Sequence, residues 1–215
     1  YNQAYIEGIQ NITPLDIKFA YELGYHIKHI GITKENNQSV ELRVHPTLVP
    51  KENILSQVHN VMNAILVNGD RFGSSMFYGH GAGGNATASA VISNVVEAIN
   101  FTMNIDKSNL NISDLVGSEK RKIKDINDIT NQFYLRIQAE DTPGVMAEIT
   151  NILANEKISI EAVTQHEPEN QKTIPIVMIT NDVTGSSIKK AVNKIESLTT
   201  IKENIVSIRV LKLNE

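Results

Sequence analysis

The carboxyl-terminal part of the chain, residues 131–215, carries a regular succession of hydrophobic patterns that restricts the fold more than any other feature. Alternating apolar residues predict strands at 133–137, 159–165, 174–180 and 206–211. Apolar residues at helical spacing predict a helix from Val145 to about Asn155, after the turn Asp141-Thr142-Pro143-Gly144. A second helix is predicted after Thr184-Gly185-Ser186. The order of elements is therefore strand, helix, strand, strand, helix, strand.

This order is the ferredoxin-like βαββαβ topology, in which two helices cover one face of a four-stranded sheet. We expect the other sheet face and the sheet edges to be open to a partner, which favours a homo-oligomer, at least a dimer. RNA-binding modules share the topology, and such a tail would bind with an affinity that falls steeply with salt. The paired sheet aromatics and basic face of an RNA binder are missing, and the net charge is −4 with a pI near 5.9. We therefore expect no nucleic-acid partner.

A glycine-dense stretch that leads into a helix is the second informative feature. Gly79, Gly81, Gly83 and Gly84 precede residues whose apolar members recur at helical spacing: Ala88, Val91, Ile92, Val95, Val96 and Ile99. Glycines allow positive φ angles and a close approach of the backbone to a ligand, and the first N–H groups of a helix attract negative charge. The stretch predicts either a backbone cradle for a ligand or a tight packing corner.

The residues before this stretch predict helices and strands of one α/β layer. Thr13, Pro14 and Asp16 mark the start of a helix that ends near Gly24. Strands are predicted at 25–33 and at 39–44, the latter ended by His45 and Pro46. A helix near 54–62 and a hairpin of 64–67 with 75–78, around Asn68-Gly69-Asp70, complete the layer.

Composition and polarity set the expected domains. Residues 103–130 are polar and rich in Asn, Asp, Lys and Ser, which predicts a linker between a first domain, 1–102, and the tail, 131–215. The fold class is α/β (α+β), a partial sheet-and-helix layer followed by the ferredoxin-like tail. No apolar run approaches the roughly 18 residues of a membrane span, and the chain has no cysteine, so we expect a cytoplasmic protein with no membrane partner. Because Tyr1 lies in a segment that already reads as ordered, we expect the chain to be part of a longer polypeptide.

Over about residues 131–213 the tail resembles an ACT domain, the amino-acid-sensing module of biosynthetic enzymes. Two motifs carry the resemblance, Asp141-Thr142-Pro143-Gly144-Val145 at the first strand-to-helix turn and Ile158-Ser159-Ile160 before the second strand. The resemblance implies that Asp141, Gly144 and Val145 bind a threonine-like effector together with the backbone of Ile158, Ser159 and Ile160. A zwitterion suits such a site, because N–H groups at a helix start accept its carboxylate and an acid holds its ammonium. The alternative is that Asp141 only caps the helix.

The first hundred residues are similar to the latter half of the catalytic region of homoserine dehydrogenase. The motifs that carry this similarity are Glu7-Gly8-Ile9, Thr13-Pro14-Leu15-Asp16-Ile17, Glu22-Leu23-Gly24-Tyr25, Val44-His45-Pro46, Gly69-Asp70, Phe77-Tyr78-Gly79 and Thr87-Ala88-Ser89-Ala90-Val91. The similarity implies an amino-terminal Rossmann domain, followed by a stretch with the substrate-binding acids and the catalytic lysine, before Tyr1.

The resemblance implies NAD(P)-dependent interconversion of L-homoserine and L-aspartate 4-semialdehyde, within threonine, methionine and isoleucine biosynthesis. NADP or NAD would be bound mainly by the missing domain, with Gly79, Gly81, Gly83 and Thr87 near the nicotinamide. We assign no catalytic residue to this chain: Lys28 reads as an exposed or salt-bridged strand residue, and the histidines show no metal-ligand spacing. The chain alone is expected to be inactive, with feedback by threonine at an interface between ACT modules. The alternative is a free-standing amino-acid-binding regulatory protein.

Overall fold

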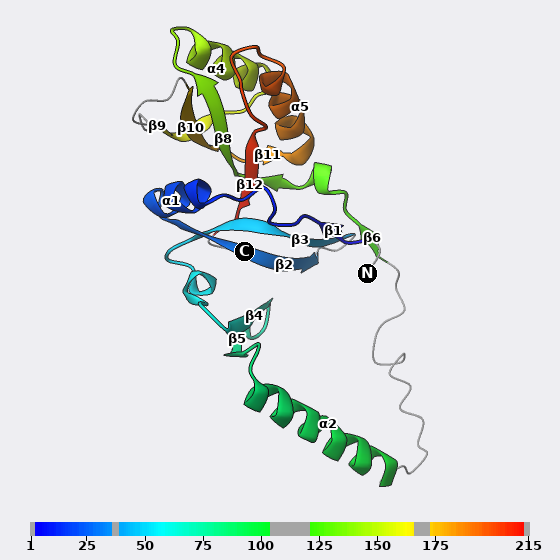
Figure 1. The fold of residues 1–215 in the computed structure, drawn as a ribbon. Helices are drawn as coiled ribbons and strands as arrows, with labels where there is room; N and C mark the ends of the chain where they lie inside the picture. The colour runs from blue at the N-terminus through cyan, green and yellow to red at the C-terminus, as the bar shows by residue number, and fades with distance from the viewer. Residues whose placement is uncertain (1–2, 36–38, 104–120, 166–172, 213–215) are drawn as a thin grey trace. The chain divides into compact units, whose positions relative to one another are not determined.

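The structure is a computed structural model that describes residues 3–35, 39–103, 121–165 and 173–212 (Figure 1). By their contacts the residues form two compact units, one of residues 1–56 with 121–215 and one of residues 57–120. The domains expected from the sequence, 1–102, 103–130 and 131–215, follow the family segments instead of this grouping, and their boundaries stay a prediction.

In the first unit the βαββαβ order of the tail is confirmed. The elements are β8 (Phe133–Glu140), α4 (Val145–Asn155), β9 (Ile160–Gln165), β10 (Thr173–Thr180), α5 (Gly185–Glu196) and β12 (Val206–Val210). The strands lie in the order β12-β8-β10-β9, and β11 (Val183–Thr184) pairs separately with β7 (Thr130–Asn131). One face of the sheet packs against α4 and α5 through a buried apolar cluster that includes Leu135, Ile137, Ile149, Leu153, Met178 and Ile195.

The sheet does not end at β12, because β12 pairs in parallel with β3 (Ser39–Pro50). Along one side β3 pairs antiparallel with β2 (Tyr25–Glu35) over its whole length. Along its other side it meets β6 (Lys122–Ile123), β1 (Tyr5–Ile6) and β12 in succession. The first fifty residues and the tail therefore share one eight-stranded sheet.

The expectation of an open second face on the tail sheet is wrong, because α1 (Pro14–Glu22) covers it. Phe19 and Ala20 of this helix pack with Tyr134, Val177 and Ile208 in a second buried cluster. The expectation of an open edge at β12 is wrong as well, since that edge pairs with β3. Among the described strands, β9 pairs only with β10, while β2, β1 and β6 each pair only with β3.

Local signals located α1 correctly but misjudged the segments that follow β2. The capping box of Thr13 and Asp16 is present with Pro14 in the first turn, and Gly24 follows the helix with a φ of 89°. The strand expected to end at Val44 continues to Pro50, because pairing on both sides outweighs the missing donor of Pro46. The helix expected near 54–62 is a single 3₁₀ turn, η1 (Ile54–Gln57), and Asn60 takes a left-handed φ of 56°.

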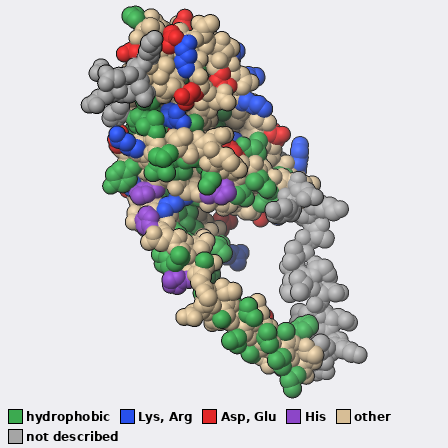
Figure 2. Space-filling view, in the orientation of Figure 1, with side chains coloured by type: hydrophobic (Ala, Val, Ile, Leu, Met, Phe, Trp, Pro, Cys, Tyr) green, Lys and Arg blue, Asp and Glu red, His purple; other side chains and the backbone are tan. Residues whose placement is uncertain are grey.

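The second unit contains the expected hairpin and the expected helix. Strands β4 (Met62–Gly69) and β5 (Gly73–His80) pair antiparallel, and α2 (Gly84–Met103) follows. The connection lies at residues 70–72, because Gly69 pairs with Gly73, whose φ is 70°. The hairpin turn therefore does not lie on Asn68-Gly69 as expected. None of the residues of α2 is buried, and Figure 2 shows apolar side chains gathered along it.

Candidate cofactor corner and effector loop

The glycine corner, residues 79–87, is shorter than the sequence suggested. Gly79 belongs to β5 and pairs with Asn63, and Gly84 is the first residue of α2, so the loop is only Gly81-Ala82-Gly83. Gly83 has a φ of 127°, and it is the one glycine of the four with a positive φ. Its carbonyl accepts the first helical hydrogen bond, from the Thr87 N–H at 3.0 Å. Thr87 therefore lies in the first turn of α2, as expected.

Packing within the described residues explains only part of the glycine content of this corner. A Cβ on Gly81 would collide with the Asn63 side chain, whereas a Cβ on Gly79, Gly83 or Gly84 would meet no atom within 4 Å. Positive φ accounts for Gly83. Gly79 and Gly84 are thus explained neither by conformation nor by contacts among the described residues, and they leave an open stretch of backbone.

The helix that follows this corner has an apolar face with no partner among the described residues. Val91, Ile92, Val95, Val96 and Ile99 are each at least half exposed, and Ile92 reaches 64%. A continuous apolar face of this kind normally packs against another protein surface. An isolated helix would also be marginally stable in water, because most helical stability in proteins comes from tertiary packing.

The turn before α4 offers uncapped backbone. Gly144 is the N-cap residue with a φ of 101°, and no side chain forms a capping hydrogen bond there. The alternative in which Asp141 only caps this helix is therefore wrong, and Asp141 is exposed. Val145 is buried in the core between the sheet and the helices. The turn thus combines an exposed carboxylate with the N-terminal end of a helix.

The second half of the expected effector set lies at the other end of α4. Ile158, Ser159 and Ile160 follow this helix of 11 residues, which at 1.5 Å per residue separates them from Gly144 by roughly 16 Å. Ile158 is buried, and its N–H donates to the Leu153 carbonyl at 2.9 Å. The Ser159 N–H donates to Oδ1 of Asn181 at 3.0 Å, a contact that the sequence did not suggest. Within one chain the structure does not bring the two halves together.

Comparisons with known proteins agree with this division of the chain. Residues 1–96 match the family model described as homoserine dehydrogenase, and residues 133–200 match the ACT domain. The homoserine dehydrogenases of Pseudomonas aeruginosa and Neisseria gonorrhoeae are 38% and 37% identical to the chain over 219 residues, covering 100% of it and 50% of each relative. The crystal structure of a homoserine dehydrogenase from Thiobacillus denitrificans superposes with a TM-score of 0.84 at 35% identity, covering 99% of this chain and 48% of that one. Over its whole length the chain is thus similar to homoserine dehydrogenases.

The chain spans about half the length of the curated homoserine dehydrogenases that it matches. The expected mixed α/β fold is confirmed, and so is the expected combination with an ACT domain. No helix in the described ranges combines the length and the apolar character needed to cross a bilayer.

Two basic residues of the described sheet, Lys28 and His45, have pKa values that burial lowers. Lys28 lies in β2 opposite Thr47, and burial lowers its pKa. His45 is fully buried, and burial, with the nearby charges of Arg209 and Arg43, lowers its pKa to about 4. Its Nδ1 lies 2.9 Å from the Pro46 carbonyl oxygen, and its Nε2 lies 3.3 Å from Nη1 of Arg43. His45 is therefore a neutral core residue. In the part of the chain that the structure describes, no group of His, Asp and Glu side chains is arranged to hold a metal.

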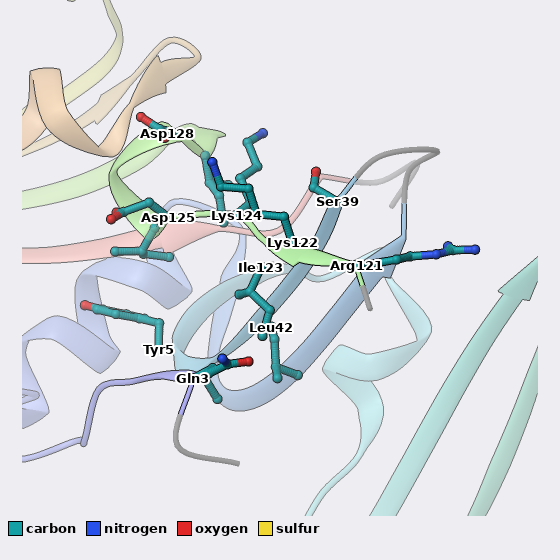
Figure 3. Close-up of a pocket in the computed structure, with 13 residues that line it drawn as sticks. Gln3, Tyr5, Ser39, Leu42, Arg121, Lys122, Ile123, Lys124, Asp125 and Asp128 are labelled. Atoms are coloured by element: carbon teal, nitrogen blue, oxygen red, sulfur yellow. The ribbon is translucent and has the colours of Figure 1, made fainter. Parts of the chain in front are cut away.

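One depression beside β1, β3 and β6 brings together charged side chains that the sequence did not single out (Figure 3). Arg121 and Lys124 line it, but they form ion pairs with Glu35 and Glu41. Asp125 also lines it and accepts hydrogen bonds from Asn127. Because Arg121 and Lys124 already pair with carboxylates of this chain, we assign no ligand to the depression.

A buried ion pair between α1 and β8 was also missed. Asp16 is fully buried, and its carboxylate accepts hydrogen bonds from Arg136 and Tyr134 of the tail. The sequence suggested only that Asp16 belongs to a capping box. No local signal could have found Arg136, because the two residues lie 120 positions apart.

Proposed function

We propose that this chain is part of an NAD- or NADP-dependent homoserine dehydrogenase that interconverts L-homoserine and L-aspartate 4-semialdehyde. The main support for this proposal is that the whole chain is similar to proteins named homoserine dehydrogenase. Its two segments also match, in this order, the homoserine dehydrogenase and ACT models. The activity itself requires a dinucleotide-binding half and a catalytic lysine that we expect outside this chain, so the 215 residues alone should be inactive. The cytoplasmic location expected from the sequence belongs to the same proposal.

In this proposal Gly79, Gly81, Gly83 and Thr87 lie against the nicotinamide end of the cofactor. A bound nicotinamide supplies the hydride acceptor, and the backbone of this corner positions it and keeps water away. The corner fits such a group, because backbone without side chains is open at Gly79 and Gly84. The apolar face of α2 would then pack against the cofactor-binding half, which accounts for its exposure in this chain.

We further propose that the tail binds an amino acid, threonine, between two copies of the protein. A threonine molecule is far too short to bridge the roughly 16 Å between the two ends of α4. It can contact both Asp141-Val145 and the Ile158-Ile160 segment only if two chains contribute to one site. The outer strand β9, which begins at Ile160, offers an unpaired edge for such a dimer. The N–H groups at the start of α4 would hold the carboxylate, and Asp141 would hold the ammonium.

The enzyme proposal is tested on the natural polypeptide that carries this chain, by following homoserine-dependent reduction of NAD⁺ and NADP⁺. Gly79→Val should raise the KM for the cofactor about tenfold or more, because the new side chain occupies the open backbone. The matched control is Ser75→Val, an exposed position on the same strand, which should leave the KM unchanged. Absence of homoserine oxidation with both cofactors, in a folded protein, would contradict the proposal.

The effector proposal is tested by calorimetry with threonine on the same polypeptide. Asp141→Asn should weaken binding about tenfold, whereas Asp128→Asn, an exposed carboxylate away from α4, should not change it. Threonine binding without any dehydrogenase activity would favour the alternative, a free-standing amino-acid-binding regulatory protein.

A further inference from the structure

Helix α1 is joined to the tail sheet through one buried carboxylate. Oδ1 of Asp16 accepts from Nε of Arg136 at 2.7 Å and from the Tyr134 hydroxyl at 3.1 Å. Oδ2 accepts from Nη2 of Arg136 at 3.3 Å, and also from the N–H of Thr13 at 2.9 Å and its hydroxyl at 2.6 Å. Asp16 therefore holds the start of α1 and the middle of β8 at the same time.

Burial of the Asp16–Arg136 pair fixes the position of this contact. Asp16 is fully buried and Arg136 is 5% exposed, next to the apolar cluster of α1 and the sheet. Burial alone would raise the pKa of Asp16, but the hydrogen bonds from Arg136 and Thr13 and the charge of Arg136 lower it below its ordinary value. Both charges are thus retained in the folded state. The planar guanidinium binds the carboxylate through two nitrogens, which fixes orientation as well as distance.

The strand that carries Arg136 leads directly into the proposed effector loop. β8 ends at Glu140, and Asp141 to Val145 follow without an intervening element. β8 is also an inner strand, paired with β10 and β12 on its two sides. A shift of the loop would therefore act on a strand that is paired on both sides and that carries Tyr134 and Arg136, the residues that contact Asp16 of α1.

We propose that the Asp16–Arg136 pair transmits the state of the effector loop to α1, so that both residues are positioning residues for regulation. This inference rests on the proposed function, because it needs an amino acid bound at the tail. The two-point ion pair has one favoured arrangement, so we expect Asp16 and Arg136 to move as a unit.

The test uses the natural polypeptide, with threonine as the probe and amide hydrogen exchange as the readout. The double variant Asp16→Leu with Arg136→Met replaces the pair by apolar side chains, an exchange that buried ion pairs often tolerate. The matched control, Glu156→Gln with Lys194→Met, removes a more accessible pair of the same tail, in which the side chain of Lys194 is 56% exposed. If the double variant does not fold, Arg136→Lys keeps the charge but loses the two-point contact, and it is judged by the same criteria.

In the wild type and in the control, threonine should slow exchange both in residues 141–155 and in α1. In the double variant, residues 141–155 should still respond, while the response of α1 should fall at least about fivefold. An unchanged response of α1 in the double variant would overturn the inference. So would a wild type in which 141–155 responds and α1 does not. If neither segment responds in the wild type, the effector proposal itself fails, and the inference fails with it.

Discussion

Helices α5 and α2 both carry apolar residues at helical spacing, but these residues have opposite surroundings. The apolar residues Ile188, Ala191 and Ile195 of α5 are buried against the tail sheet. The corresponding face of α2, from Val91 to Ile99, is exposed. The unit of α5 has two buried clusters, one on each face of its sheet, whereas the described part of the unit of α2 contains a hairpin and a helix with no buried residue. A hydrophobic pattern thus predicts a helix and its apolar face. It does not predict whether the same chain supplies the surface that covers this face.

The largest expected effect comes from the buried ion pair of the first unit. Arg136→Met leaves the Asp16 carboxylate buried without its cation, which should lower the free energy of unfolding by about 3–5 kcal/mol. Denaturant titration of the 215-residue chain measures this. Lys194→Met removes a cation that is 56% exposed from its pair with Glu156, and this should lower the free energy of unfolding by about 1 kcal/mol or less. Equal effects of the two variants would show that Asp16 is not buried as described.

Matched isoleucines in the two units give the next test. Ile149→Ala creates a cavity in the core beneath α4 and should cost about 3 kcal/mol. Ile92→Ala on α2 should change the stability of the chain by less than about 0.5 kcal/mol, because this side chain is 64% exposed. Thermal or denaturant unfolding of both variants compares them directly. A cost at Ile92 as large as that at Ile149 would mean that α2 already has a partner within the chain.

Acid should lower the free energy of unfolding of the first unit, because His45 binds a proton more readily in the unfolded chain than in the folded one. Burial lowers the pKa of this imidazole to about 4 in the folded chain, against about 6.5 when unfolded. Between these values the unfolded state binds more protons, so stability falls as the pH falls from about 6.5 to 4, by at most about 3 kcal/mol. His45→Gln should flatten the pH dependence in that window. The lowered pKa of Asp16 acts in the same direction, but mainly below about pH 4. A slope unchanged by His45→Gln would contradict a neutral, buried histidine.

The smallest expected change in stability is at the glycines that precede or begin the two helices α4 and α2. Gly144→Ala meets no atom within 4 Å but keeps a φ of 101°, so it should cost about 1 kcal/mol through backbone strain alone. Gly84→Ala also meets open space, has no positive φ and lies in a helix, so it should be neutral or slightly stabilising. Differential scanning calorimetry resolves the difference. Destabilisation at Gly84 would indicate a close contact within the chain.

The sequence predicted features that depend on near neighbours and missed those that depend on distant ones. The capping box at Thr13, the hairpin of β4 and β5 and the βαββαβ order all follow from residues a few positions apart. The continuation of β3 through His45 and Pro46 could not be predicted, because it depends on pairing with β12, more than 150 residues later. The Asp16–Arg136 pair could not be predicted either, because its two residues lie 120 positions apart.

The candidate site shows the same limit. The positions of Gly79, Gly83 and Thr87 beside α2 were predicted from the local pattern, although the loop is shorter than expected. The two halves of the effector set were grouped by motif, but α4 separates them. Only an arrangement of two chains could unite them, and no pattern within one sequence contains that information.

The most direct test of this account is the hydrogen exchange of α2, residues 84–103, measured in the isolated 215-residue chain and in the natural polypeptide that carries it. If a surface outside this chain covers the apolar face, exchange should be about a hundredfold slower in the natural polypeptide than in the chain alone. Protection that is already complete in the chain alone, or absent in both, would contradict the account.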